Sequence, residues 1–522
     1  MYPGRYAAAE PDRPAVHEVA TGRTITYRQL EDSSVRFAHW LRAHGVGAGD
    51  HIAVLSVNDA SVFELYWGAL RSGAYITFVN SHLSAAEAGY IVDDCDATVL
   101  AVSAPLAPLA EEIVALTPKV AHRLAFSGPI TGHLVYEDEI AGLPTEPPAD
   151  QPRGSDMLYS SGTTGRPKGI KPPLTGARIE DEPGPPLLKT VRGFGFGEDS
   201  VYLSPAPIYH SAPLRYSVST QALGGTVVLM ERFEPELALD CIERYRVTHS
   251  QWVPTHFVRL LKLPREVRDR YDLSSMRYAL HSAAPCPVEV KQELMRWWGE
   301  IVYEYYSATE AIGSTVVTPQ EWLRKPGCVG RTGGPGTLGL ARICDEAGRV
   351  LPAGEIGTVY FERRDFSFEY HKDPVKTASA RHPFREFWFT TGDLGYLDDD
   401  DVLFLTGREN FTIISGGVNI YPQEVESVLA LHPLVHDVAV VGVPDADLGE
   451  RVEAFVQLSP HVVDSDDPER EILEFCRERL SRFKCPRQVR VVDGLPRTPT
   501  GKMVKGELRE LIARYGDSGV PS

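Results

Sequence analysis

The first 150 residues alternate between two patterns of apolar positions. Apolar side chains recur every three or four residues in some segments, which predicts amphipathic helices, and form short continuous runs in others, which predicts buried strands. Helices are predicted over residues 26–44, 61–72 and 85–94, and strands over residues 51–56, 74–79 and 98–102. Strands that alternate with helices in this way predict a parallel sheet with helices on both faces.

The same alternation continues through the middle third of the chain. Strands are predicted over residues 201–204, 226–230, 277–281 and 301–306. In open α/β sheets, ligands bind at the loops that follow the strands. His210, the stretch 282–285 and the segment Tyr306–Glu310 each follow one of these strands, so they are candidates for a site.

The pattern changes from about residue 355. A β-rich region is predicted, with strands over residues 357–362, 387–391 and 402–405. A smaller α/β unit is predicted after Arg408, with helices over residues 421–431 and 471–482 and strands over residues 435–443 and 451–458. Because single cores stop growing near ~250–300 residues, a chain of 522 residues is expected to form two or more domains.

The stretch Tyr159–Gly169, YSSGTTGRPKG, has the chemistry of a phosphate-binding loop. Its glycines let backbone N–H groups turn inward, its hydroxyls add neutral donors, and Lys168 supplies a positive charge for a polyphosphate. No Gly-x-x-x-x-Gly-Lys-Ser/Thr run can be laid over it, so it differs from the P-loop of other nucleotide enzymes. The residues 171–198 that follow are rich in Pro and Gly and predict a long surface loop, with a lid over the phosphate loop as the alternative.

Two further segments carry candidate chemistry. In Tyr306–Glu310 an aromatic ring that can stack on a purine precedes a hydroxyl and a carboxylate, and a carboxylate beside a phosphate loop is a natural Mg²⁺ ligand. Asp393 follows Thr391 and a glycine in a predicted turn, where its carboxylate can accept hydrogen bonds from sugar hydroxyls. Near the C-terminus, Pro496–Lys505 forms a glycine turn that presents Lys502.

Composition and charge exclude several classes of protein. The 53 basic and 71 acidic residues give a net charge of −18, which argues against nucleic acid or an anionic membrane as the general partner. Seven scattered cysteines without a Cys-x-x-Cys pair are expected to be reduced and structural. No apolar signal core follows Met1, and no run approaches the ~18 apolar residues of a transmembrane span. A cytosolic protein is therefore expected.

Taken together and in order, these segments resemble the core motifs of the AMP-forming adenylate-forming superfamily, in its acyl-CoA synthetase branch. The similarity covers nearly the whole chain and rests on five blocks: Tyr159–Gly169, Tyr306–Glu310, Thr391–Asp393, Gly407–Glu424 and Pro496–Lys502. It implies an α/β fold with a large N-terminal domain, residues 1–407, that combines helix-covered parallel sheets with a β-rich subdomain. A small mobile α+β domain, residues 408–522, is expected to carry Lys502.

The resemblance implies that the protein uses ATP and Mg²⁺ to join a carboxylic acid to CoA through an acyl-adenylate. Lys502 and Thr309 would act at the reacting carboxylate and α-phosphate, His210 would gate the acyl pocket, and Glu310 would bind Mg²⁺. In the same comparison Tyr306 would stack on adenine, and Asp393 with Arg408 would hold the ribose. Contacts to the nucleotide or CoA are implied for Ser160, Ser161, Gly162, Thr163, Thr164, Gly165, Lys168, Ser282, Ala283, Ala284, Tyr306, Ser307, Asp393, Arg408, Ser415, Gly416 and Gly417.

The sequence departs from the family pattern at two places that concern function. Asn410 and Phe411 stand where the hinge usually has a charged residue, and Ser307 stands where glycine is commonest. We therefore expect a bias toward one half-reaction, so that an enzyme specialised for thioester formation from a supplied adenylate is one alternative. Adenylation for a carrier-protein thiol, an oxidised adenylate, and a non-catalytic adenylate sensor are others. The identity of the acid and a homodimer stay open.

Overall fold

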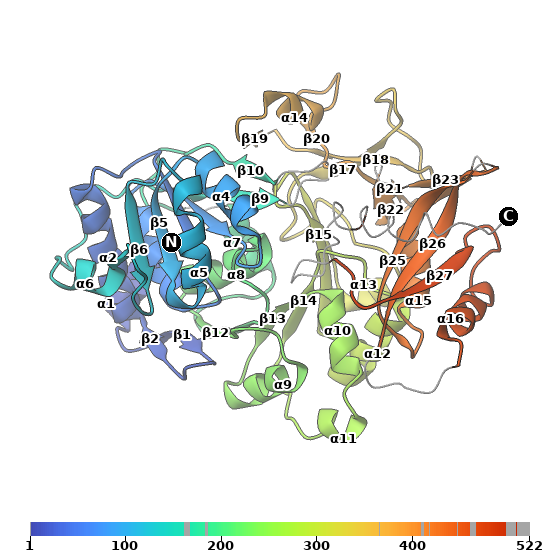
Figure 1. Ribbon diagram of the computed structural model, residues 1–522, viewed down its shortest axis with the longest axis horizontal. Helices are drawn as coiled ribbons and strands as arrows, with labels where there is room; N and C mark the ends of the chain where they lie inside the picture. Colours follow the sequence, from blue (N-terminus) through green and yellow to red (C-terminus); the bar gives the residue numbers. More distant parts are fainter. Residues whose placement is uncertain are drawn as a thin grey trace.

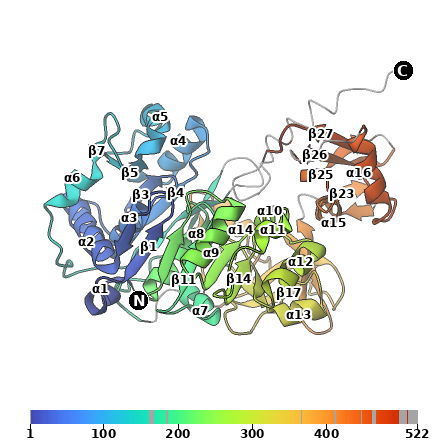
Figure 2. The ribbon, with the colours of Figure 1, turned by 90° about the horizontal axis from the view of Figure 1, so that it is seen from below.

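The computed structural model describes residues 2–160, 167–182, 186–364, 366–408, 412–416, 418–445, 447–459, 466–496 and 508. Three bodies built on separate sheets follow one another along the chain, and Figure 1 shows them from the blue N-terminal part to the red C-terminal part. In a view turned by 90°, the C-terminal sheet lies to one side of the rest (Figure 2). Within the described ranges, no helix is long and apolar enough to cross a lipid bilayer.

The N-terminal sheet is parallel throughout, in the strand order β7-β6-β5-β3-β4-β8. Its strands are β3 (His51–Leu55), β4 (Tyr75–Val79), β5 (Ala97–Ser103), β6 (His122–Phe126), β7 (Leu134–Val135) and β8 (Ser155–Asp156). The helices are α1 (Gly4–Ala9), α2 (Tyr27–Ala43), α3 (Ser61–Arg71), α4 (Ala85–Asp94), α5 (Ala107–Glu112) and α6 (Tyr136–Ala141). The predicted alternation of helix and strand in this region is thereby confirmed.

Both faces of this sheet are buried. Along β3, Ile52 and Val54 join one apolar core while Ala53 and Leu55 join another on the opposite face, as the two-residue period of a strand requires. Local capping fixes where helices begin, since Thr26 and Gln29 form a reciprocal capping box at the start of α2.

A second, mixed sheet forms the centre of the molecule in the order β16-β15-β14-β13-β11-β12-β1-β2. It is parallel from β15 to β1 and has antiparallel strands at its two edges. Its strands are β1 (Pro14–Glu18), β2 (Thr24–Thr26), β11 (Val201–Ser204), β12 (Thr226–Leu229), β13 (His249–Trp252), β14 (Tyr278–His281), β15 (Val302–Ser307) and β16 (Ser314–Val317). The helices are α8 (Ser211–Ala222), α9 (Pro235–Arg244), α10 (Pro254–Leu261), α11 (Arg265–Arg268), α12 (Val288–Trp298) and α13 (Pro319–Arg324).

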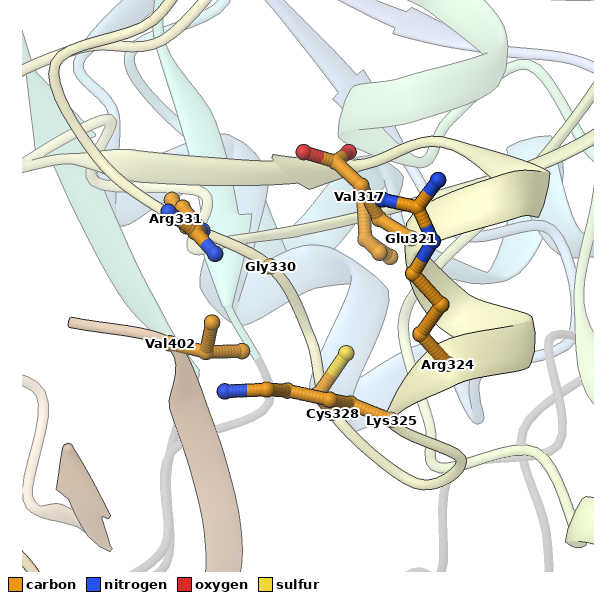
Figure 3. Close-up of a pocket in the computed structure, with 8 residues that line it drawn as sticks. All are labelled: Val317, Glu321, Arg324, Lys325, Cys328, Gly330, Arg331 and Val402. Carbon is orange, nitrogen blue, oxygen red and sulfur yellow. The ribbon is translucent and has the colours of Figure 1, made fainter. Parts of the chain in front are cut away.

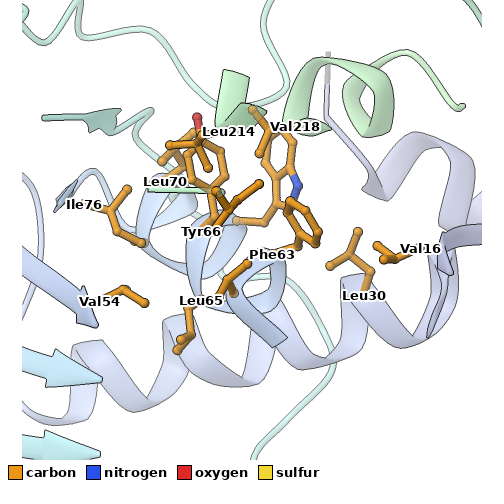
Figure 4. Close-up of a cluster of buried hydrophobic side chains, with 14 of the residues drawn as sticks. Val16, Leu30, Val54, Phe63, Leu65, Tyr66, Leu70, Ile76, Leu214 and Val218 are labelled. Atoms are coloured by element: carbon orange, nitrogen blue, oxygen red, sulfur yellow. The ribbon is translucent and has the colours of Figure 1, made fainter. Parts of the chain in front are cut away.

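The two sheets share one apolar core. Leu214 and Val218 of α8 lie beside Tyr66 and Leu70 of α3, and all four belong to the same buried cluster (Figure 4). This packing fixes α8, and with it the loop that contains His210, against the N-terminal body.

The stretch 171–198 is not a continuous loop, as the sequence predicted. It contains a helix, α7 (Pro186–Gly193), whose Leu188 and Val191 are buried in the shared core. Proline is favoured in the first turn of a helix, and burial of this short apolar face outweighs the turn-forming composition around it. The expected surface insertion is therefore wrong for this part of the stretch.

Two smaller sheets lie beyond the central one. A hairpin of β9 (Leu158–Ser160) and β10 (Lys168–Lys171) pairs with β19 (Glu369–Tyr370), which leads into α14 (Pro374–Ser379). The predicted β-rich region is an antiparallel sheet in the order β17-β18-β21-β22, with β20 paired to β18. Its strands are β17 (Leu340–Cys344), β18 (Gly357–Glu362), β20 (Trp388–Phe389), β21 (Asp393–Leu397) and β22 (Leu403–Arg408).

The chain beyond residue 412 folds around a core of its own. Its strands are β23 (Ile413–Ser415), β24 (Val418–Ile420), β25 (Val435–Asp445), β26 (Gly449–Leu458) and β27 (Gln488–Val492), with α15 (Pro422–Leu429) and α16 (Pro468–Arg477) packed on them. The helix predicted over 471–482 begins earlier because Asp467 caps it and Pro468 occupies its first position. All seven cysteines of the chain are free thiols.

Candidate active site

The predicted phosphate loop connects the two strands of a hairpin. Ser160 at the end of β9 and Lys168 at the start of β10 are register partners, so the backbone brings the two ends of the loop together. Ser161, Gly162, Thr163, Thr164 and Gly165 lie outside the described residues.

Lys168 faces a polar cavity of about 330 Å³. Its Nζ lies 2.6 Å from Oδ2 of Asp373, and this hydrogen bond lowers the pKa of the Asp373 carboxyl. The cavity is lined by Tyr90, Asp94, Pro167, Lys168, His371, Lys372 and Asp373. A phosphate bound at Lys168 would compete with Asp373 for the same ammonium group.

Tyr306, Asp393 and Arg408 form a connected network. The Tyr306 hydroxyl donates to Oδ2 of Asp393 at 2.6 Å, and Nε of Arg408 donates to Oδ1 of the same carboxylate at 2.6 Å. Thr391 adds a third hydrogen bond, 2.9 Å from its Oγ1 to Oδ2. Burial, with the Asp393 charge, raises the pKa of the Tyr306 phenol, so this group stays a neutral donor. Three residues from two predicted motifs are thus brought together.

Glu310 is buried at the end of the loop that follows β15. Its Oε1 accepts a hydrogen bond of 2.7 Å from the Tyr370 hydroxyl, and the described part of the chain supplies no ion-pair partner for it within 4 Å. A buried carboxylate without a basic partner is costly unless a cation binds it. The residue therefore fits a divalent cation, and the one protein carboxylate found there suits Mg²⁺, which takes most of its other ligands from water and phosphates.

Strand β19 connects the phosphate-loop hairpin to Glu310. Tyr370 pairs with Ile170 on β10, and its side chain is the one that donates to Glu310. Asp373, three residues later, holds Lys168. Through this strand, Lys168 and Glu310 reach the same side of the molecule.

Thr309 is positioned by a residue of α8. Nη1 of Arg215 donates to the Thr309 carbonyl at 3.1 Å and to the hydroxyl of Ser211 at 3.0 Å. The same guanidinium forms an ion pair of 2.7 Å with Asp156, at the end of β8. His210 is the N-cap of α8, so it lies directly beside this group, with its ring centroid 4.4 Å from that of Tyr209.

The loop after β14 contains a backbone conformation that is rare for its residue. Ala283 has φ of 76°, a region that favours glycine, while Ala284 beside it is exposed and Ser282 is buried. Such conformations cost of order 1–3 kcal/mol and gather at functional sites. On β15, the Ser307 hydroxyl donates to the Gly313 carbonyl at 2.9 Å.

The predicted CoA-side residues belong to the C-terminal sheet. Ser415 pairs with Gly449, and the Gly416 N–H donates to the Leu448 carbonyl at 2.8 Å, so the printed contacts of both stay within that sheet. Gly417, Lys502 and the hinge residues Asn410 and Phe411 lie outside the described residues.

A second cavity, of about 140 Å³, contains none of the predicted site residues (Figure 3). It is lined by Val317, Glu321, Arg324, Lys325, Cys328, Gly330, Arg331 and Val402. Lys325 in its wall forms ion pairs with Asp398 and Asp400, which ties α13 to the turn before β22.

Sequence reasoning missed three residues of the site. Arg215, Tyr370 and Asp373 hold Thr309, Glu310 and Lys168 respectively, across sequence separations of 94, 60 and 205 residues. Only Arg215 left a local signal, because it stands one helical turn beyond the loop of His210.

Comparisons with known proteins agree with this arrangement. Residues 4–370 match the AMP-binding enzyme family, and residues 424–502 match the AMP-binding enzyme C-terminal domain. A feruloyl-CoA synthase from Amycolatopsis sp is 33% identical over 99% of this chain and 98% of its own. A fatty acid–[acyl-carrier-protein] ligase, ScoC, from Streptomyces coeruleorubidus is 30% identical over 98% and 96%.

Among solved structures, the anthranilate CoA ligase AuaEII in complex with anthranoyl-AMP superposes with a TM-score of 0.85 at 27% identity, covering 98% of this chain and 97% of that one. The predicted fold class is thereby confirmed for both the large N-terminal part and the small C-terminal part. The chain belongs to the AMP-binding enzyme family, the adenylate-forming enzymes.

Proposed function

We propose that the protein is an AMP-forming acid–CoA ligase, which uses ATP to activate a carboxylic acid and then transfers the acyl group to the thiol of CoA. The observation that carries this proposal is the convergence of Lys168, Glu310, Thr309 and the Tyr306–Asp393–Arg408 network. The CoA ligases among its relatives support the choice of thiol.

In the first step, the acid carboxylate attacks the α-phosphorus of ATP and pyrophosphate leaves. Both reactants are anions, so the enzyme has to position them and neutralise charge rather than supply a general base. We assign the triphosphate to Lys168 and the hydroxyls of its loop, adenine to Tyr306 and the ribose to Asp393 with Arg408. Lys502 would bridge the carboxylate and the α-phosphate, beside Thr309. Mg²⁺ held by Glu310 would neutralise phosphate charge.

In the second step, the CoA thiolate attacks the acyl carbonyl carbon, and AMP leaves. We propose that residues 408–522 rotate as a mobile domain on residues 1–407, exchanging Lys502 for the segment Ser415–Gly417 at the site. The neutral hinge, Asn410 and Phe411, would then bias the protein toward one orientation and one half-reaction.

A carrier-protein thiol is the second candidate acceptor, because ScoC, which is similar over nearly the whole chain, is named for one. Incubation of the enzyme with ATP, Mg²⁺ and a panel of acids tests the proposal: acid-dependent AMP and pyrophosphate are expected, with thioester when CoA is added. Thioester with a phosphopantetheinylated carrier protein but not with CoA would change the acceptor. Without AMP or pyrophosphate for any acid, the proposal fails.

The Lys502→Ala variant separates the two steps. It should lose adenylate formation from acid and ATP but keep thioester formation from a supplied acyl-adenylate. Equal loss of both steps would contradict the role proposed for Lys502.

A further inference from the structure

Several buried polar atoms gather between α8 and the central sheet without hydrogen bonds. Buried polar groups in folded proteins are nearly always paired, so an unpaired set requires a physical reason such as a bound ligand or water. Within the described residues, no hydrogen-bond partner exists for the hydroxyls of Tyr202, Ser204, Tyr216, Ser217 and Tyr305 or for Oε1 of Gln251. We call these six residues the tyrosine cluster.

The members of the cluster face one another. The ring centroids of Tyr202 and Tyr216 are 6.1 Å apart, and those of Tyr216 and Tyr305 are 5.8 Å apart. Tyr202, Tyr216 and Gln251 are at most 3% exposed. Gln251 uses its amide nitrogen on the Trp252 carbonyl, at 3.0 Å, which leaves its oxygen as an open acceptor. The cluster therefore offers both donors and an acceptor.

The three phenols are neutral at physiological pH. Burial raises the pKa of Tyr305 to about 12, although the polar atoms of Ser282, Tyr216 and Gln251 lie near enough to lower it in part. None of these neighbours makes a hydrogen bond of ordinary geometry with the Tyr305 hydroxyl. The group can thus donate to an added molecule.

The cluster borders the candidate active site. Tyr305 precedes Tyr306 on β15, and successive side chains of a strand point to opposite faces: Tyr306 bonds Asp393, whereas Tyr305 contacts Tyr216 of α8. On α8, Tyr216 directly follows Arg215, which holds the Thr309 carbonyl. A molecule with one end at Thr309 therefore has the cluster beside its other end.

We propose that the tyrosine cluster binds the body of the acid, and that this acid is aromatic and carries a hydroxyl, amino or oxo group on the side of the ring away from its carboxylate. This inference rests on the proposed function. Tyr216 lies five residues, or ~7.5 Å of helix rise, beyond Ser211 at the mouth of the site, which leaves room for about one substituted ring. The edges and faces of Tyr202, Tyr216, Tyr305 and Phe196 suit a planar ring.

A plain alkyl chain would fit poorly in this place. It would bury the open hydroxyls and the Gln251 oxygen without pairing them, whereas an acid with matching polar groups would satisfy them. Sites built to hydrogen-bond a substrate group reject the analogue that lacks it. The cluster therefore selects against unbranched fatty acids.

Matched pairs of acids test the inference. 3-Phenylpropanoate is compared with its 4-hydroxy, 4-amino and 4-acetyl derivatives, and octanoate serves as the alkyl acid, with AMP release as the readout. We expect kcat/KM for at least one derivative to exceed that of 3-phenylpropanoate and octanoate by tenfold or more. In Tyr305→Phe and Tyr216→Phe this ratio should fall by about tenfold. Equal or faster turnover of octanoate or 3-phenylpropanoate would overturn the inference but leave the proposed function intact.

A stability measurement gives a readout that does not depend on activity. Removing an unpaired buried hydroxyl is neutral or stabilising, whereas removing a paired one is destabilising. Tyr305→Phe should therefore keep or raise the Tm of the ligand-free protein. Tyr27→Phe is the matched control and should lower the Tm, because its buried hydroxyl lies 3.0 Å from the Gln221 carbonyl and 2.7 Å from the Gly225 carbonyl. A clear drop in Tm for Tyr305→Phe would show that its hydroxyl is paired within the protein, and would contradict the inference even if no acid were turned over.

Discussion

The hydroxyl of Tyr306 donates a hydrogen bond of 2.6 Å to Asp393, a residue 87 positions further along the chain. The contact joins β15 of the central sheet to β21 of the antiparallel sheet. Asp393 has its other oxygen on Arg408, at the last residue of β22. An adenine-stacking candidate and a ribose-binding candidate are therefore held in one fixed geometry before any nucleotide binds.

Asp393→Asn should raise the KM for ATP by about 10- to 100-fold, because hydrogen bonds to a charged group contribute ~1.5–3 kcal/mol each. The measurement is pyrophosphate release at varied ATP. Tyr306→Phe serves as the graded comparison: it removes one of the three hydrogen bonds to Asp393 and should raise the KM less. An Asp393→Asn enzyme with an unchanged KM for ATP would remove this residue from the nucleotide site.

Glu310→Gln should lower the Mg²⁺-dependent rate by at least 100-fold and raise the Mg²⁺ concentration needed for half-maximal activity. The amide keeps the size of the side chain but loses the charge that a hard cation requires. Glu300→Gln is the control, since Glu300 is exposed and bonded only to Gln320 among the described residues. If Glu310→Gln titrates with Mg²⁺ as the wild type does, Glu310 is not the metal ligand.

Arg215→Met should impair both stability and adenylation. Removing one partner of a largely buried ion pair costs ~3–5 kcal/mol, because the remaining charge has no counterpart, and Asp156 would be left in this state. The double variant Arg215→Met with Asp156→Asn should recover most of the stability, as judged by urea unfolding. It should not recover the adenylation rate, because nothing then holds the Thr309 carbonyl. A double variant with wild-type rates would reduce Arg215 to a structural role.

The local elements of this fold follow from hydrophobic periodicity, and the connections between them do not. The helix predicted over 85–94 matches α4 because its capping box and its apolar spacing are both local in sequence. Helix α7 escaped prediction because its stability comes from the burial of Leu188 and Val191 in a core that distant segments build. The amino-acid order around residue 186 contains turn formers and carries no sign of that core.

The candidate site divides in the same way. Lys168, Glu310 and Asp393 stand in motifs that can be read from the sequence, because their chemistry requires particular neighbours. Tyr370 and Arg215 act through contacts between sheets, and the tyrosine cluster spans β11, α8, β13 and β15. Such sets become visible only when the topology brings the strands together.

Glu64 makes the stability depend on pH. Burial raises the pKa of its carboxyl from 4.5 to about 7, against the opposing effect of Arg23, 3.3 Å away. Because the folded pKa exceeds the unfolded one, the folded state binds a proton more tightly, so its contribution to stability is full below about pH 4.5 and is lost as pH rises to about 7.

Glu64→Gln should therefore stabilise the protein relative to wild type more at pH 8 than at pH 5, by about 2.5 kcal/mol from the linkage relation. Free energies of unfolding at the two pH values check this difference. Glu137→Gln, an exposed acidic neighbour on α6, is the control and should show little change. A Glu64→Gln effect that is the same at both pH values would contradict the raised pKa.

The transfer of oxygen from acid to nucleotide tests the central claim most directly. The enzyme is incubated with ATP, CoA and an acid whose carboxylate is labelled with ¹⁸O, and the AMP is analysed by mass spectrometry. If a carboxylate oxygen attacks the α-phosphorus, and the thiol then cleaves the acyl–oxygen bond, each AMP carries one ¹⁸O and the pyrophosphate carries none. AMP without the label, label in the pyrophosphate, or formation of ADP and phosphate would contradict the acyl-adenylate mechanism.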